Sequence, residues 1–229
     1  MIWRAMRSEG PAVAQRIKAV IDLHRSVSEP VISIHAGHRF EVDPGVFSPF
    51  IAPSGSVGLA FSAIPGLRGK RVLDIGCGSG VIACMMALSG AERVVGVDIN
   101  PAAVANAKRN ASNLGLDELT SFREGRLFDP ISQFEQFDVI MADLPFTPGE
   151  PADMLEAAFY DPGLTSIREL VASLPNHLQD QQAKGFICLS GFGGEEIPKQ
   201  IKAEGMRHHS FLRLDLEWMS FDLLRVSLK

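Results

Sequence analysis

The chain has 229 residues, of which 46% are hydrophobic and 21% are charged, and its formal net charge is −5. These values are typical of a folded domain and exclude intrinsic disorder, a coiled coil and a collagen-like chain. The longest apolar run, residues 81–88, is far shorter than the ~20 residues that a membrane-spanning helix needs, and the first residues lack the apolar stretch of a secretion signal, so we expect a cytoplasmic protein without a membrane partner.

The N-terminal part predicts a helix followed by a hairpin. Apolar side chains recur at helical spacing over residues 11–25. Two short β-prone segments, residues 31–34 and 39–42, flank an Ala-Gly pair, which is typical of a hairpin. We therefore expect residues 1–53 to form a helix and hairpin cap, and residues 54–229 to form the main domain.

From residue 70 onward, strand and helix patterns alternate. Strands are predicted at 72–75, 94–98, 120–123, 137–142 and 185–189, helices at 56–64, 81–88, 101–114, 164–179 and 197–203, and a terminal antiparallel pair at 207–212 and 219–227. This order predicts an α/β fold with a doubly wound, mostly parallel sheet covered on both faces. Such sheets bind ligands at the carboxyl ends of their strands, so the loops after Ile75, Val97 and Ala142 are the candidate ligand-binding loops.

The first of these loops is rich in glycine. Residues 72–80 read Val-Leu-Asp-Ile-Gly-Cys-Gly-Ser-Gly. The glycines let the backbone turn tightly from strand to helix and approach a ligand closely. Asp74 lies in this strand, and Asp98 ends the next one, where a carboxylate can accept both hydroxyls of a ribose. The spacing differs from the Gly-x-Gly-x-x-Gly pattern of dinucleotide-binding proteins.

Residues 72–80 and 94–100 together resemble the S-adenosylmethionine (SAM) site of the class I, Rossmann-like methyltransferases. The resemblance implies that the glycines lie along the methionine and ribose parts of SAM, that Asp98 holds the ribose diol and that Asp74 faces the methionyl amino group. It also implies a backbone contact to adenine near Leu127 with Phe128 alongside, because Arg126 stands where relatives carry an acidic acceptor. The cofactor-binding candidates are Asp74, Gly76, Cys77, Gly78, Gly80, Asp98, Ile99, Leu127, Phe128 and Asp143.

The loop after the fourth core strand reads Asp143-Leu144-Pro145-Phe146. It resembles the [Asn/Asp]-Pro-Pro-[Tyr/Phe] motif of amino-directed methyltransferases, with Leu144 where proline is usual. In that motif a side-chain oxygen and a main-chain carbonyl accept the two N–H groups of the target and aim its lone pair, and the aromatic ring stacks on the target. The resemblance implies that these four residues, Asp143, Leu144, Pro145 and Phe146, are catalytic.

Residues 40–49 resemble the entry segment of a small-domain group related to release-factor glutamine and ribosomal RNA guanine-N2 methyltransferases. In that group a Phe/Pro-rich loop closes over SAM, which makes Phe47 and Phe50 candidates for the substrate pocket. A third candidate is Tyr160, the only tyrosine, in an acidic segment at residues 148–163 that contains no Lys or Arg. Such a segment would attract an amine and repel a phosphate-rich substrate.

The resemblance implies a SAM-dependent methyltransferase, N-directed, acting on an amine or amide of a small molecule or a protein. An RNA methyltransferase is disfavoured: the net charge opposes it, but basic residues of the first helix (Arg4, Arg7, Arg16, Lys18 and Arg25) leave it open. The sequence also leaves open an intramolecular cyclisation of SAM with release of methylthioadenosine, and a non-catalytic SAM-binding partner. The Cys and His spacing predicts no metal site.

Overall fold

The computed structural model describes residues 2–51, 59–60, 63–190, 195–215 and 220–229, with the side chains described from residue 13 onward. The chain begins with helix α1 (Ile2–Arg25) and the hairpin of β1 (Val31–His35) and β2 (His38–Val42). The hairpin prediction is confirmed, but α1 starts nine residues before the predicted position. Pro11 therefore lies inside the helix, where it lacks one N–H of the hydrogen-bond ladder. Most of the predicted helix at 56–64 lies outside the described residues.

The rest of the chain alternates strands and helices much as predicted. In order the elements are β3 (Arg71–Ile75), α3 (Val81–Leu88), β4 (Arg93–Asp98), α4 (Pro101–Asn113), β5 (Thr120–Glu124), β6 (Val139–Ala142), two short 3₁₀ turns η1 (Glu156–Ala158) and η2 (Pro162–Leu164), α5 (Thr165–His177), β7 (Lys184–Ser190), α6 (Glu196–Ala203), β8 (Met206–Asp215) and β9 (Ser220–Leu228). Helix α4 starts as predicted: the Asn100 side chain accepts from the Ala102 N–H and Pro101 occupies the first turn.

Seven strands form one sheet in the order β5-β4-β3-β6-β7-β9-β8. The first five are parallel, and β9 pairs antiparallel with both β7 and β8. The predicted Rossmann-like architecture is therefore confirmed, with its N-terminal helix and hairpin and its antiparallel C-terminal pair. From β3 the chain builds outward to β4 and β5, then returns to the other side of β3 with β6. The strand order reverses between β3 and β6, which is where such folds bind ligands.

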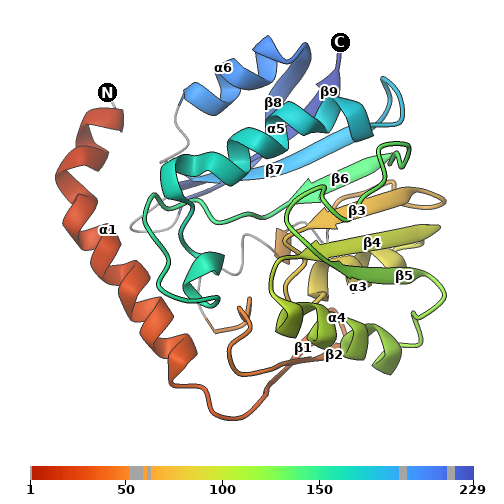
Figure 1. Ribbon diagram of the computed structural model, residues 1–229, viewed down its shortest axis with the longest axis horizontal. Coiled ribbons are helices and arrows are strands. Elements are labelled where there is room, and N and C mark those ends of the chain that lie inside the picture. Colours follow the sequence, from red (N-terminus) through yellow and green to blue (C-terminus); the bar gives the residue numbers. More distant parts are fainter. Residues whose placement is uncertain (1, 52–58, 61–62, 191–194, 216–219) are drawn as a thin grey trace.

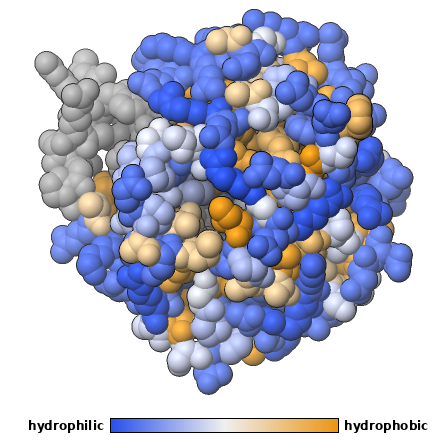
Figure 2. Space-filling view, viewed as in Figure 1, coloured by the Kyte–Doolittle hydropathy of each residue, from blue (hydrophilic) through white to orange (hydrophobic). Residues whose placement is uncertain are grey.

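Both faces of the sheet are covered by helices (Figure 1). Successive strand residues point to opposite faces, so Val72 packs in the same core cluster as Met86 of α3, while Leu73 packs in the cluster that contains Leu170 of α5. The surface seen in Figure 2 is mostly hydrophilic, with hydrophobic side chains visible near its middle. The strands are apolar on both faces, so both faces are buried against helices. The packed sheet supports the loops at its carboxyl edge.

Two buried asparagines of α4 hold the hairpin against the main domain. Asn106 accepts from the Asp43 N–H at 2.8 Å and donates to the Glu41 carbonyl at 2.7 Å. Asn110 donates to the same carbonyl at 2.8 Å and to the Ser79 carbonyl at 2.9 Å. One side chain thus connects the hairpin to the glycine-rich loop. Asn106 and Asn110 are four residues apart and therefore share one face of α4. This spacing is the feature of the sequence from which their common role could have been predicted.

Candidate active site

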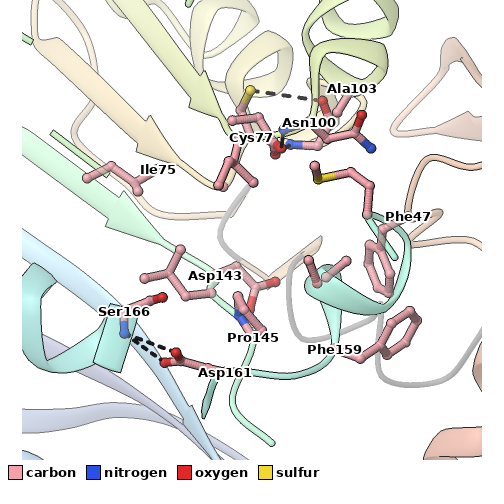
Figure 3. A pocket seen from close by; sticks show the side chains of 18 of the residues that line it. Phe47, Ile75, Cys77, Asn100, Ala103, Asp143, Pro145, Phe159, Asp161 and Ser166 are labelled. Carbon is pink, nitrogen blue, oxygen red and sulfur yellow. Dashed lines mark hydrogen bonds between the residues drawn. The ribbon is translucent and has the colours of Figure 1, made fainter. Parts of the chain in front are cut away.

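A cavity of about 350 Å³ lies at the carboxyl edge of the sheet, within the roughly 300–1,000 Å³ of pockets that hold small ligands. Its inner wall is made by the loops after β3, β4, β5 and β6. Its outer wall is made by Phe47 and by the segment at residues 151–162, which we call the flap (Figure 3). The cavity is therefore at the reversal point of the sheet, as the loop positions predicted.

The glycine-rich loop forms the floor of the cavity. Gly76 and Gly78 have left-handed φ angles of 78° and 52°. A Cβ on Gly76 would lie 3.2 Å from the Asp143 carbonyl oxygen, whereas one on Gly78 would enter open space. Gly80 does not line the cavity: a Cβ there would lie 2.7 Å from the Cβ of Ala107, so this glycine lets α3 and α4 pack closely.

Asp98 accepts hydrogen bonds from two loops, the glycine-rich loop after β3 and the loop after β4. Its Oδ2 accepts from the Gly78 N–H at 2.8 Å and its Oδ1 accepts from the Asn100 N–H at 2.9 Å. Burial raises the pKa of this carboxyl, and the backbone hydrogen bonds oppose the rise. A carboxylate has about four lone-pair sites, so Asp98 can accept two hydroxyls while it keeps both backbone bonds. Ile99, half exposed, lines the cavity beside it.

Asp143 follows β6 and lines the cavity together with Leu144, Pro145 and Phe146. Burial raises the pKa of Asp143 to about 6, and a hydrogen bond from the Cys188 thiol of β7 opposes the rise. The loop is held from behind. Ser190 Oγ donates to the Phe146 carbonyl at 3.3 Å, and the Phe146 ring packs edge-on against Phe221 with centroids 5.0 Å apart.

The outer wall is aromatic. Phe47 stacks on His24 of α1 with centroids 5.2 Å apart and meets Phe159 of the flap edge-on at 5.4 Å. His24 is buried and accepts from the Ser48 N–H at 3.1 Å. Tyr160, the third substrate-pocket candidate, also lines the cavity. Phe159 and Met154 also line the cavity, although neither was predicted. Phe159 adjoins Tyr160 along the chain, a signal that could have identified it, whereas Met154 carries no such signal.

Three acidic side chains of the flap have partners within the chain. Arg25 of α1 pairs with Asp153 at 2.6 Å and with Glu156 at 2.7 Å. Asp161 lines the cavity but accepts from the backbone N–H of Ser166 at 3.0 Å (Figure 3). These three acidic side chains therefore hold the flap in place, and the expectation that they attract an amine has no support from their contacts.

Several predicted site residues lie outside the cavity lining. Phe128 instead stacks on His177 with centroids 4.4 Å apart, and Phe50 packs against the cluster that contains Val42 and Ala103. Leu127 does line the cavity, with a left-handed φ of 50°. Arg126 also lines it and forms an ion pair with Glu169 of α5.

Asp74 is buried beneath the lining, with 1% of its surface exposed. It accepts a hydrogen bond from the Ala83 N–H of α3, while its Oδ2 has no hydrogen-bond partner among the described residues. Burial, followed by the nearby Asp143 and Asp98, raises the pKa of Asp74 to about 8. An unpartnered buried carboxyl oxygen beside two other carboxyls fits a ligand that carries positive charge. Cys77 lines the cavity, and its buried thiol has a pKa raised by burial and by Asp98.

Comparison with known proteins agrees with this geometry. A family model described as a methyltransferase domain matches residues 67–205. A putative protein N5-glutamine methyltransferase of Methanocaldococcus jannaschii is 30% identical, over 78% of this chain and 89% of the relative. A release factor glutamine methyltransferase of Gloeobacter violaceus is 27% identical, over 82% and 69%. A ribosomal protein L11 methyltransferase of Alteromonas mediterranea is 31% identical, over 69% and 46%.

Solved structures share the fold. The T. thermophilus 16S rRNA N2 G1207 methyltransferase, in complex with AdoMet and guanosine, has a TM-score of 0.64 and 20% identity over 88% of this chain and 50% of that chain. A ribosomal protein L11 methylase of Lactobacillus delbrueckii has a TM-score of 0.58 and 19% identity over 82% and 84%. The chain spans about half the length of the Alteromonas and T. thermophilus enzymes.

The chain therefore belongs to the methyltransferase-domain family, as the two sequence motifs predicted. It is a class I, SAM-dependent methyltransferase, and SAM is its cofactor. The cavity residues fit SAM: Gly78 leaves open space at the floor, Asp98 can accept a ribose diol, and the buried carboxyls suit a cation. In the described part of the chain, no helix is long and apolar enough to cross a bilayer.

Proposed function

We propose that the enzyme methylates a nitrogen, the amide or amine of a protein side chain or of a small molecule. The observation that carries this proposal is the position of Asp143. Its carboxyl lies in the cavity at the end of β6, within a loop fixed from behind by the Ser190 hydrogen bond and the Phe221 ring. SAM supplies the methyl group as a sulfonium electrophile. The chain's own residues have to place a nucleophilic lone pair in line with it.

Two acceptors can do this. The Asp143 carboxylate takes one N–H of the target, and the Leu144 carbonyl takes the other, so that the nitrogen lone pair is directed to the cofactor. The Phe146 ring stacks on a planar amide or covers a cation. With a pKa of about 6, the Asp143 carboxylate is ionised at neutral pH and acts as an acceptor. The apolar outer wall of Phe47, Met154 and Phe159 excludes water from the reacting groups.

Within this proposal a protein side-chain amide is the favoured substrate. The Methanocaldococcus and Gloeobacter relatives are both named as glutamine methyltransferases, and this chain covers 89% and 69% of them. RNA is disfavoured because Lys18 and Arg25, two of the basic residues that left it open, pair with acidic side chains of this chain. The proposed enzyme acts in the cytoplasm.

The test is a labelling reaction with isotopic SAM and cell extract. A label that protease removes and ribonuclease leaves supports a protein substrate, and the reverse assigns RNA. A label in the low-mass fraction assigns a small molecule. Identification of adenosylhomocysteine as the nucleoside product supports methyl transfer, whereas methylthioadenosine would establish the cyclisation instead. The Asp143→Ala variant should bind SAM and label at least tenfold more slowly, and Asp143→Asn, which keeps an acceptor oxygen, should retain part of the activity.

A further inference from the structure

Three carboxyl groups come from neighbouring strands at the glycine-rich end of the cavity, two in its lining and one buried beneath it. Asp98 ends β4, Asp74 lies in β3, and Asp143 follows β6, and these strands are adjacent in the order β4-β3-β6. Asp74 interacts electrostatically with both of the others. We call these three residues the carboxyl cluster. The cluster differs from a group of exposed acidic residues, because the Asp74 Oδ2 is buried without a hydrogen-bond partner among the described residues.

The groups around the cluster supply little opposing charge. Arg126, the basic side chain of the lining, pairs with Glu169, and Asp161 is engaged by the α5 backbone. Tyr160 of the flap lines the same cavity, and three buried thiols interact with the cluster. They are Cys77 of the glycine loop, Cys84 of α3 and Cys188 of β7, and burial raises the pKa of each. Like charges in a desolvated site cannot all ionise without cost, so burial and the two neighbouring carboxyls favour the protonated form of Asp74 in the ligand-free site.

We propose that the carboxyl cluster distinguishes the cofactor from its product by charge, and that loading of SAM drives the retained proton into solvent. This inference rests on the SAM assignment and on no particular methyl acceptor. SAM and adenosylhomocysteine share an ammonium and a carboxylate, but only SAM carries the sulfonium charge. A cation within the low-dielectric site stabilises ionised carboxylates far more than it would in water. After methyl transfer the sulfonium charge is gone, the cluster takes its proton back, and the product leaves more readily.

The sign of the pH dependence follows from linkage. With a pKa of about 8 in the ligand-free site, Asp74 is protonated at pH 6 to 7 and has to ionise when a cation enters. SAM affinity therefore rises as the pH increases from about 6 to about 8 and levels off above that. The slope is at most ~tenfold per pH unit for each proton released. Adenosylhomocysteine affinity rises less over the same range, so the preference for SAM grows with pH.

The experiment is isothermal titration calorimetry of the whole chain with SAM and with adenosylhomocysteine, at pH 7, in buffers of different ionisation enthalpy. The dependence of the observed heat on the buffer gives the number of protons released. We expect a larger release with SAM than with adenosylhomocysteine. Equal release for the two ligands, or none for SAM, overturns the proposal with the unaltered protein alone. If neither ligand binds, the SAM assignment itself has failed, and the two failures are thus distinct.

Asp74→Asn gives the second arm, because it keeps the shape and removes the titration. The variant should match the unaltered enzyme in SAM affinity at pH 6 and bind SAM at least fivefold more weakly at pH 8.5, and its extra proton release with SAM should vanish. A merely structural role for Asp74 predicts the same loss at both pH values. The matched control is Asp117→Asn, which removes an exposed carboxylate at the opposite edge of the sheet and should change neither quantity.

Discussion

At the scale of single residues, two carboxyl groups differ in what we expect them to do: Asp98 serves cofactor binding, and Asp143 serves methyl transfer. Asp98 is tied into the loops that hold the cofactor, whereas Asp143 belongs to the loop expected to face the methyl acceptor. We therefore expect Asp143→Ala to bind SAM nearly normally and to lower kcat and kcat/KM together by at least tenfold, because lost orientation alone can cost on the order of 10²-fold. Calorimetry and initial rates measure the two effects separately. A fully active Asp143→Ala enzyme would refute the aiming mechanism.

The pH profile tests the same residue without a substitution. Burial raises the Asp143 pKa to about 6, so the acceptor form is lost as the pH falls through 6. Because the bound cation stabilises the ionised carboxylate, we expect kcat at saturating SAM to fall only below about pH 6 and to remain level above it, with the fall absent in Asp143→Asn. Saturating SAM removes the contribution of Asp74 to cofactor affinity. An unchanged profile in the asparagine variant would assign the titration to another group.

Two glycines of one loop give a matched pair. Gly80→Ala should destabilise the fold by about 2–4 kcal/mol, because the new methyl meets α4 at 2.7 Å in a left-handed conformation. Gly78→Ala meets no atom within 4 Å and should cost only about 1–2 kcal/mol of backbone strain. Its methyl group would stand in the cavity and should weaken SAM binding more than Gly80→Ala does. Urea unfolding and calorimetry of both variants measure this reversal of effects.

The sequence alone indicated which loops form the site, but not how each side chain is used. Gly76, Gly78, Asp98 and Asp143 line the cavity because local patterns place them at strand ends. The motif could not show that Gly80 packs on Ala107 or that Phe128 stacks on His177, since those partners are 27 and 49 residues away along the chain. Such contacts depend on tertiary packing, which periodicity does not report.

At the scale of elements, α1 and the flap are joined through one side chain. Arg25 bonds both Asp153 and Glu156, and His24 next to it contacts Phe47 and Phe159. We expect Arg25→Gln to increase amide hydrogen exchange in residues 151–160, and the difference from the unaltered enzyme should shrink at high salt because partly exposed ion pairs are screened.

Lys18→Gln is the control for this prediction. It removes another basic side chain of α1, one that pairs only with Asp22 of the same helix among the described residues. This variant should leave flap exchange unchanged. If both substitutions loosen the flap equally, the cause is the charge of α1 as a whole rather than the contact that joins the helix to the flap.

At the scale of the molecule, the predicted cap at residues 1–53 and the predicted domain at 54–229 share one hydrophobic core. Val13, Ile17, Ile21 and Phe40 from the cap belong to the same buried cluster as residues of α3 and α4. We expect one cooperative unfolding transition, with far-UV and near-UV circular dichroism giving the same midpoint. A cap that melts first would show two separate midpoints and would make residues 1–53 an independent unit.

The strand order also determines which edge of the sheet is exposed while the chain is being synthesised. β9 follows β8 in synthesis but lies between β7 and β8, with Phe221 and Leu223 buried on one face of the sheet and Leu224 and Val226 on the other. Until β9 has left the ribosome, β7 has no neighbour on that side, and β8 has no strand with which to pair. An open, apolar strand edge is a site of aggregation. The nascent chain therefore carries an exposed sheet edge until β9 emerges. A premature stop before Ser220 would leave that edge permanently open, although every loop of the cofactor cavity would already have been translated.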